Sequence, residues 1–126
     1  MKKAVFSCIV FIVLIACNSS SSEKVKSEGS SVDVTSNPDY QKGLTLVANN
    51  KCMTCHAISE VITGPSYSEV AQKYANSSDT IVAHLAEKII SGGNGIWSEI
   101  FMTPHPDVSK EDAEAMVRYI LLLNKL

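Results

Sequence analysis

A Cys-x-x-Cys-His motif is the most constraining feature of this 126-residue chain. Cys52 and Cys55 are separated by two residues, and His56 follows the second cysteine directly. Such a group of thiols and an imidazole occurs in three kinds of site: a redox-active dithiol, half of a zinc site, or the attachment site of a covalently bound haem. Each kind of site needs different features in the rest of the chain.

The N-terminal segment has the features of an export signal. Two lysines precede an apolar run over residues 4–16, which is shorter than the ~20 residues that span a bilayer. The run leads into Leu-Ile-Ala-Cys at residues 14–17, which resembles a bacterial lipobox. This resemblance implies a lipoprotein signal peptide over residues 1–16 and lipidation of Cys17, which would anchor the chain in membrane lipid. An ordinary signal peptide with a chance cysteine is the alternative.

The next segment differs sharply in composition from the rest of the chain. Residues 18–37 are rich in serine and contain no aromatic residue. Because such a sequence buries too little apolar surface to offset its chain entropy, we expect a flexible tether over residues 17–37. The folded domain is then expected over residues 38–126. The formal charge of −2 for the whole chain does not suggest a nucleic-acid partner.

Capping residues and apolar periodicity predict two helices in the first half of this domain. The first begins at Pro38, with Asn37 as its cap, and ends near Asn50. The second follows Ser66 and Glu69, which have the spacing of a capping box. The apolar stripe expected on the first helix consists of Leu44, Val47 and Ala48.

Two further helices are predicted in the second half. The third is capped near residues 77–78 and ends at Gly92, and an irregular loop rich in glycine and proline occupies residues 93–107. The last helix begins at Ser109, where Asp112 completes the spacing of a second capping box. Its expected buried face consists of Ala113, Met116, Val117, Ile120 and Leu123.

The pattern is therefore all-α, with four helices and no convincing strand, and this favours haem attachment. A thioredoxin-like dithiol needs neighbouring strands, and a zinc site needs two more ligands than Cys52 and Cys55 supply. Two cysteines about one helical turn apart can reach both vinyl groups on one edge of a porphyrin. The adjacent His56 can then bind the iron, and an export signal fits a haem that is attached outside the cytoplasm.

Downstream motifs strengthen this interpretation. Gly64-Pro65 lies shortly after the attachment motif, and residues 92–106 read GGNGIWSEIFMTPHP. Together these motifs make residues 38–125 resemble the small class I cytochromes c, especially the bacterial cytochrome c551 type. Three departures from the family pattern are Ser98 in place of a glycine, Thr103 in place of the first proline after the ligand, and Val47 where an aromatic residue often packs the first helix on the last.

The resemblance implies a small cytochrome c fold with four helices around one covalently bound haem c. It also implies that the carbonyl of Pro65 accepts a hydrogen bond from His56, that Met102 is the distal iron ligand, and that Trp97 lines the haem and points its indole N–H to a propionate. The metal ligands are then His56 and Met102. The other cofactor-binding residues are Cys52, Cys55, Pro65 and Trp97.

Other residues compete for the distal position. Met53 is tied between the attachment cysteines, and Met116 is expected to pack in the core of the last helix. His84 is expected at the surface or edge of the third helix. His105, three residues after Met102, is the strongest competitor, and we interpret it as a residue near the ligand and not as the ligand itself.

The function that this ligand set implies is the transfer of single electrons. An iron bound by histidine and methionine has no open position for a substrate, so we expect an electron carrier and not an enzyme. The expected partners are redox proteins such as a quinol-oxidising complex or a terminal oxidase, at the periplasmic or cell-surface side of a bacterial membrane. Two alternatives stay open: a haem-based sensor or gas-binding module in which Met102 leaves the iron, and a haem subunit of a larger oxidoreductase.

Overall fold

The computed structural model describes residues 33–126, and within this range the chain is all-α, as its sequence predicts. The expected signal peptide and Cys17 lie outside the described residues. Apart from one isolated bridge between Gly93 and Met102, residues 33–126 contain no strand. The four α-helices are α1 (Pro38–Asn49), α2 (Tyr67–Lys73), α3 (Thr80–Ser91) and α4 (Lys110–Leu122). Three single-turn 3-10 helices are η1 (Val34–Ser36), η2 (Cys52–Thr54) and η3 (Leu123–Lys125).

Local capping determines where three of the helices begin. The side chain of Asn37 accepts a hydrogen bond from the backbone of α1, and Ser66 and Glu69 form a complete capping box at α2. Ser109 caps α4 by accepting from the backbone N–H of Asp112, but the second half of the expected box is not formed there. The carboxylate of Asp112 instead lies 3.6 Å from the ammonium of Lys42 on α1.

The cap expected for the third helix is wrong by one or two residues. Helix α3 begins at Thr80 with Asp79 at the cap position, and the side chain of Asp79 makes no capping hydrogen bond. The hydroxyl of Ser78 instead lies 2.7 Å from that of Thr80. Helix α3 therefore depends more on its packing against α4 than on its first turn.

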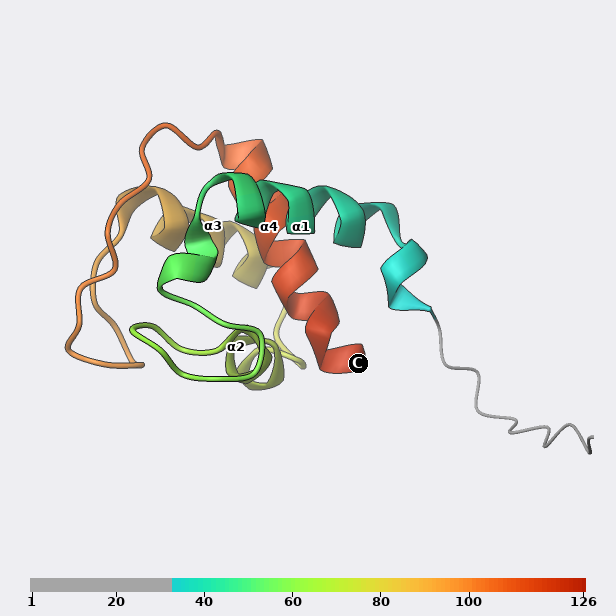
Figure 1. The fold of residues 1–126 in the computed structure, drawn as a ribbon, viewed down its shortest axis with the longest axis horizontal. Coiled ribbons are helices and arrows are strands. Elements are labelled where there is room, and N and C mark those ends of the chain that lie inside the picture. Colours follow the sequence, from blue (N-terminus) through green and yellow to red (C-terminus); the bar gives the residue numbers. More distant parts are fainter. Residues whose placement is uncertain (1–32) are drawn as a thin grey trace, which may run out of the picture. The chain divides into compact units, whose positions relative to one another are not determined.

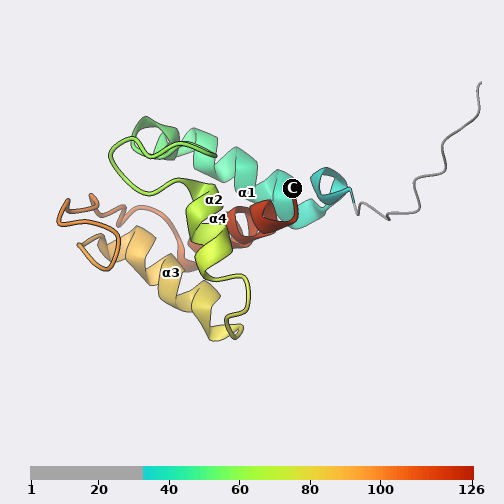
Figure 2. The same cartoon turned by 90° about the horizontal axis from the view of Figure 1, so that it is seen from below.

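Helix α4 forms the centre of the fold and packs against α1, α2 and α3 (Figures 1 and 2). All five residues of its predicted face are buried. Tyr119 and Ala115 are buried as well, so α4 has apolar contacts on more of its circumference than one stripe provides. Apart from Ala115, the buried residues of α4 belong to one core cluster with Val47, Tyr67, Ala71, Ala86 and Val108.

Helices α1 and α4 cross at Gly43. The buried side of α1 therefore differs from the apolar stripe that the sequence predicts. A Cβ atom at Gly43 would collide with the Cβ of Tyr119 and the carbonyl oxygen of Ala115. The helices therefore approach along Gly43 and Val47, whereas Leu44 and Ala48 are exposed. The ring of Tyr40 packs edge-on against that of Tyr119, with 5.0 Å between centroids. An aromatic contact between the first and last helices thus exists one helical turn before Gly43, and not at Val47.

Residues 33–37 form part of the folded structure, although they fall within the range expected to be a tether. Helix η1 packs against α1, and its Val34 is buried. The side-chain amide of Gln41 donates to the carbonyl oxygen of Thr35 over 2.7 Å. Residues 33–37 therefore pack against the domain expected over residues 38–126. Across residues 33–126, no helix combines the length and the apolar character that a bilayer crossing requires.

Candidate haem-binding site

A large cavity of about 620 Å³ lies among the helices and loops of the domain. Its lining is mostly apolar, and its volume falls within the ~300–1,000 Å³ that is usual for cofactor and ligand sites. The two segments that carry the predicted haem residues, 52–65 and 93–107, lie at the same end of the domain (Figures 1 and 2). All six residues predicted to bind the cofactor line this one cavity: Cys52, Cys55, His56, Pro65, Trp97 and Met102.

The attachment motif occupies a single tight turn at the end of α1. The backbone N–H groups of Cys55 and His56 both donate to the carbonyl oxygen of Cys52, over 3.2 and 3.1 Å. Lys51, just before this turn, has a φ of 57°, a conformation that L-residues other than asparagine and aspartate rarely adopt. The left-handed residue turns the chain from α1 into the motif, and nothing in the sequence pattern marks it.

The chemistry of the two cysteines does not suit a redox dithiol. Cys52 and Cys55 are not linked by a disulfide, and burial raises the pKa of the Cys52 thiol. An activated cysteine has a lowered pKa, because the thiolate is the nucleophile. Within residues 33–126, no three side chains of the types His, Cys, Asp and Glu come together as a metal site would require.

The imidazole of His56 is held from one side by the backbone of the next loop. Its Nδ1 lies 2.7 Å from the carbonyl oxygen of Pro65. Since a carbonyl can only accept, Nδ1 carries the proton and Nε2 keeps the free lone pair that a metal ion would need. Gly64 packs directly against the ring, and a Cβ there would lie 2.8 Å from Nδ1 and still closer to Cε1.

The phenol ring of Tyr67 also fixes His56. The two rings are stacked, with 5.3 Å between centroids and 15° between planes. Tyr67 is buried, and this burial, with a smaller contribution from Cys52, raises the pKa of its hydroxyl far above the ordinary value. The phenol therefore stays neutral and places no charge beside the imidazole. Sequence reasoning missed this contact, although Tyr67 directly follows the Ser66 cap.

Met102 lies in the loop, and its backbone is pinned to the end of α3. The N–H and C=O of Met102 exchange two hydrogen bonds with Gly93, each of 3.0 Å. Gly92 has a φ of 67°, and a Cβ there would collide with the carbonyl oxygen of Met102 and lie 2.7 Å from the nitrogen of Pro104. The sequence predicts Gly92 as a helix stop; the structure gives it the second task of letting the Met102 segment approach α3.

Trp97 lies at the edge of the cavity and is partly exposed. Its ring packs edge-on against Tyr74, with 6.5 Å between centroids, and the ammonium of Lys73 lies 5.5 Å from the indole ring. A tryptophan with one apolar side and one wet side is suited to a cofactor boundary. The neighbouring loop residues Ile96, Ile100 and Phe101 are all exposed.

The competing residues have different positions. Met53 is exposed and does not line the cavity, whereas Met116 is almost fully buried in the core and also borders the cavity. His84 is exposed on α3, and His105 is half-buried on the loop; both border the cavity. His105 is therefore near the Met102 segment, as its spacing suggests.

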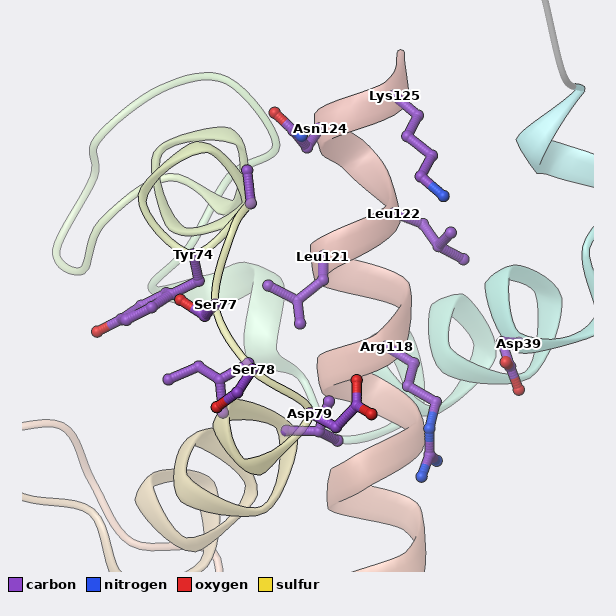
Figure 3. A pocket seen from close by; sticks show the side chains of 13 residues that line it. Asp39, Tyr74, Ser77, Ser78, Asp79, Arg118, Leu121, Leu122, Asn124 and Lys125 are labelled. Carbon is purple, nitrogen blue, oxygen red and sulfur yellow. The ribbon is translucent and has the colours of Figure 1, made fainter.

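A second and smaller pocket lies between the end of α4 and the start of α3 (Figure 3). Its volume is about 290 Å³, and Arg118, Lys125, Asp39 and Asp79 are among its charged lining residues. No cysteine, histidine or methionine lines it, so it offers no ligand for a haem iron.

A helical domain whose Cys-x-x-Cys-His turn and methionine loop border one apolar cavity defines the class of c-type haem proteins. The family model described as cytochrome c matches residues 40–124. The chain therefore belongs to the cytochrome c family, and its cofactor is one covalently bound haem c.

Named relatives agree with this assignment. Cytochrome c-552 of Nitrosomonas europaea is 37% identical over 83 residues, which cover 66% of this chain and 80% of the relative. Cytochrome c-551 of Azotobacter vinelandii is 40% identical over 81 residues, which cover 64% of this chain and 96% of the relative. The crystal structure of the Nitrosomonas europaea protein matches with a TM-score of 0.61 over 64% of this chain and 99% of that chain, at 37% identity. A class 1 cytochrome, MtoD of Sideroxydans lithotrophicus, matches with a TM-score of 0.54 at 29% identity.

The residues of the cavity fit a haem c. Two thiols on one turn can form the thioether links, and a histidine with a free Nε2 follows them directly. A methionine lies on a separate loop at the same cavity, and the lining between these groups is mostly apolar. This combination of donor groups and apolar surface is the one that a macrocycle with a buried iron requires.

Proposed function

We propose that this monohaem electron carrier holds its haem through Cys52 and Cys55 and binds the iron through His56 and Met102. The single observation that carries the proposal is the joint position of the two donors: His56, with Nε2 free, and Met102 line one apolar cavity. With this thioether and this imidazole as its ligands, a haem iron would have no position left for substrate and would exchange electrons only.

The bound haem supplies the redox chemistry. The chain's own residues hold the iron ligands in place and exclude water from the cavity. Pro65 and Tyr67 restrain the imidazole of His56, which would keep this ligand in place when the iron gains or loses an electron. The two hydrogen bonds of Gly93 hold the backbone of Met102 in the same way. Trp97 closes part of the cavity edge, and its indole N–H is proposed to donate to a haem propionate.

The proposed location is the outer side of a bacterial membrane. The lipobox-like residues 14–17 support lipidation of Cys17, and a random coil of roughly 20 residues spans on the order of 25 Å. A domain on such a tether could reach membrane redox complexes, and the proposed donors and acceptors are a quinol-oxidising complex and a terminal oxidase. Cys17 and most of the tether lie outside the described residues, so this part of the proposal depends on sequence alone.

Visible spectroscopy of the purified holoprotein tests the ligand assignment. A bond between a thioether and ferric iron gives a weak absorption band near the red end of the visible range. Met102→Ala should abolish this band, whereas Met116→Leu should keep it, because that substitution only exchanges core volume. Loss of the band in Met116→Leu, or its persistence in Met102→Ala, would refute Met102 as the ligand. Binding of carbon monoxide by the unaltered ferrous protein would favour a gas-binding module instead.

A further inference from the structure

His105 is a second metal-binding side chain at the haem cavity that the proposed ligand set does not use. It lies three residues after Met102 and lines the same cavity. The side chain is half-buried, and none of the side-chain hydrogen bonds among residues 33–126 involves its imidazole. A half-buried imidazole without a partner is free to bind another group.

The backbone of His105 is anchored independently of Met102. The N–H of His105 donates to the carbonyl oxygens of both Ile89 and Ile90, in the last turn of α3, over 3.1 Å each. Met102 is held instead by Gly93. A change at the Met102 side chain therefore leaves His105 at the cavity, because the two anchors share no hydrogen bond.

The segment between the two anchors has few hydrogen bonds, although Pro104 packs closely against Gly92. Thr103 and Pro104 are both exposed, and neither backbone N–H nor hydroxyl of Thr103 forms a hydrogen bond within the described part of the chain. The departure from the family pattern, in which a proline comes directly after the ligand, falls at Thr103. Threonine leaves φ free where a proline would fix it, although Pro104 still favours an extended backbone at Thr103.

We propose that His105 is a reserve ligand, which binds the haem iron when the thioether of Met102 is not bound to it. This inference rests on the proposed role of Met102 as the distal ligand. The exchange breaks one iron–sulfur bond and forms one iron–nitrogen bond with the neutral imidazole, and it transfers no electron.

His84 is the matched control, because it is a histidine that borders the same cavity. It lies on the helix α3, is exposed, and is far from Met102 in sequence. A general effect of removing any cavity histidine would appear in both the His84 and the His105 variants. The loss of a reserve ligand would have an effect only in the His105 variant.

The test compares three haem-loaded variants. The first carries Met102→Ala alone, the second carries Met102→Ala with His105→Ala, and the third carries Met102→Ala with His84→Ala. Ferric electron paramagnetic resonance reports the spin state, and carbon monoxide binding to the ferrous form reports an open iron position. We expect low-spin iron without the red band in the first and third proteins. The second protein should be high-spin and should bind carbon monoxide at once.

Each other outcome overturns the inference. High-spin iron in Met102→Ala alone shows that His105 does not reach the iron, and leaves the proposed function intact. Low-spin iron in the variant that lacks both Met102 and His105 shows that another group is the reserve ligand. A red band that persists in Met102→Ala overturns both the reserve role and the proposed ligand set. If Met102→Ala loads haem poorly, Met102→Leu keeps the side-chain volume and gives the same three readouts.

Discussion

The carbonyl oxygen of Pro65 lies 2.7 Å from Nδ1 of His56, and Gly64 packs against the same imidazole ring. The Gly64-Pro65 pair therefore does two things: the proline fixes the tautomer of the ring, and the glycine leaves the space in which the ring lies. This relationship joins two segments that are eight or nine residues apart, and the proposed iron ligand depends on both.

Gly64→Ala should displace the imidazole of His56. The added Cβ would contact three ring atoms, so either the ring or the loop must move. We expect a loss of ~1–3 kcal/mol in the free energy of unfolding, together with a shift in the reduction potential. Gly95→Ala is the control, since a Cβ at Gly95 meets no heavy atom within 4 Å. Equal effects of the two substitutions in denaturant titration would contradict this account.

Gly92→Ala should disturb the Met102 loop more than Gly93→Ala does. Both glycines have positive φ angles, 67° and 107°, so alanine is strained at either position. Only at Gly92 does the new Cβ also collide with the backbone of Met102. We expect both variants to lose stability, and only Gly92→Ala to weaken the red absorption band. A weaker band in Gly93→Ala alone would show that the collision is unimportant.

Ser66→Ala should destabilise the domain by ~1–2 kcal/mol. Ser66 is buried, its backbone N–H donates to the carboxylate of Glu69 over 2.9 Å, and its hydroxyl accepts from the N–H of Glu69 over 3.2 Å. Ser109→Ala removes a cap of which only one bond is formed and which is exposed, so its cost should be smaller. Thermal unfolding of the two holoproteins measures the difference, and the reverse order would refute it.

The chain without haem should be largely unfolded. The cavity of about 620 Å³ occupies the interior of a domain of fewer than 100 residues, and a ligand bound only to the native state stabilises that state. A Cys52→Ser, Cys55→Ser variant should therefore lose helical circular dichroism and release its haem on extraction. Sharp cooperative unfolding of this variant in the absence of haem would contradict the prediction.

Cys17→Ser should release the protein from membranes. The expected anchor depends on the thiol of Cys17, whereas Cys8 lies inside the expected signal peptide. Cys8→Ser is therefore the matched control and should leave the protein in the membrane fraction after a salt wash. Retention of the Cys17→Ser protein under the same conditions would rule out lipidation at this position.

The attachment motif and most of the helix ends could be predicted because their causes are local. Asn37, Ser66 and Ser109 each cap a helix through a backbone group two or three residues away. Cys52, Cys55 and His56 act together for the same reason, because one turn brings them close. The buried face of α4 could also be predicted, since apolar residues at helical spacing must be shielded from water.

Only the tertiary structure decided which surfaces of α1 and α3 pack against the rest of the domain. Gly43 contacts Tyr119 across most of the domain's sequence, and Gly92 contacts Met102 across the intervening loop. The Gly43 contact leaves Leu44 exposed, although the periodicity alone placed it in the core. Packing against α4 allows α3 to begin without a side-chain cap. The sequence of each helix determines that it has an apolar side. Which residues of that side become buried depends on where the smallest side chains let two backbones approach, and that is a property of the packed domain.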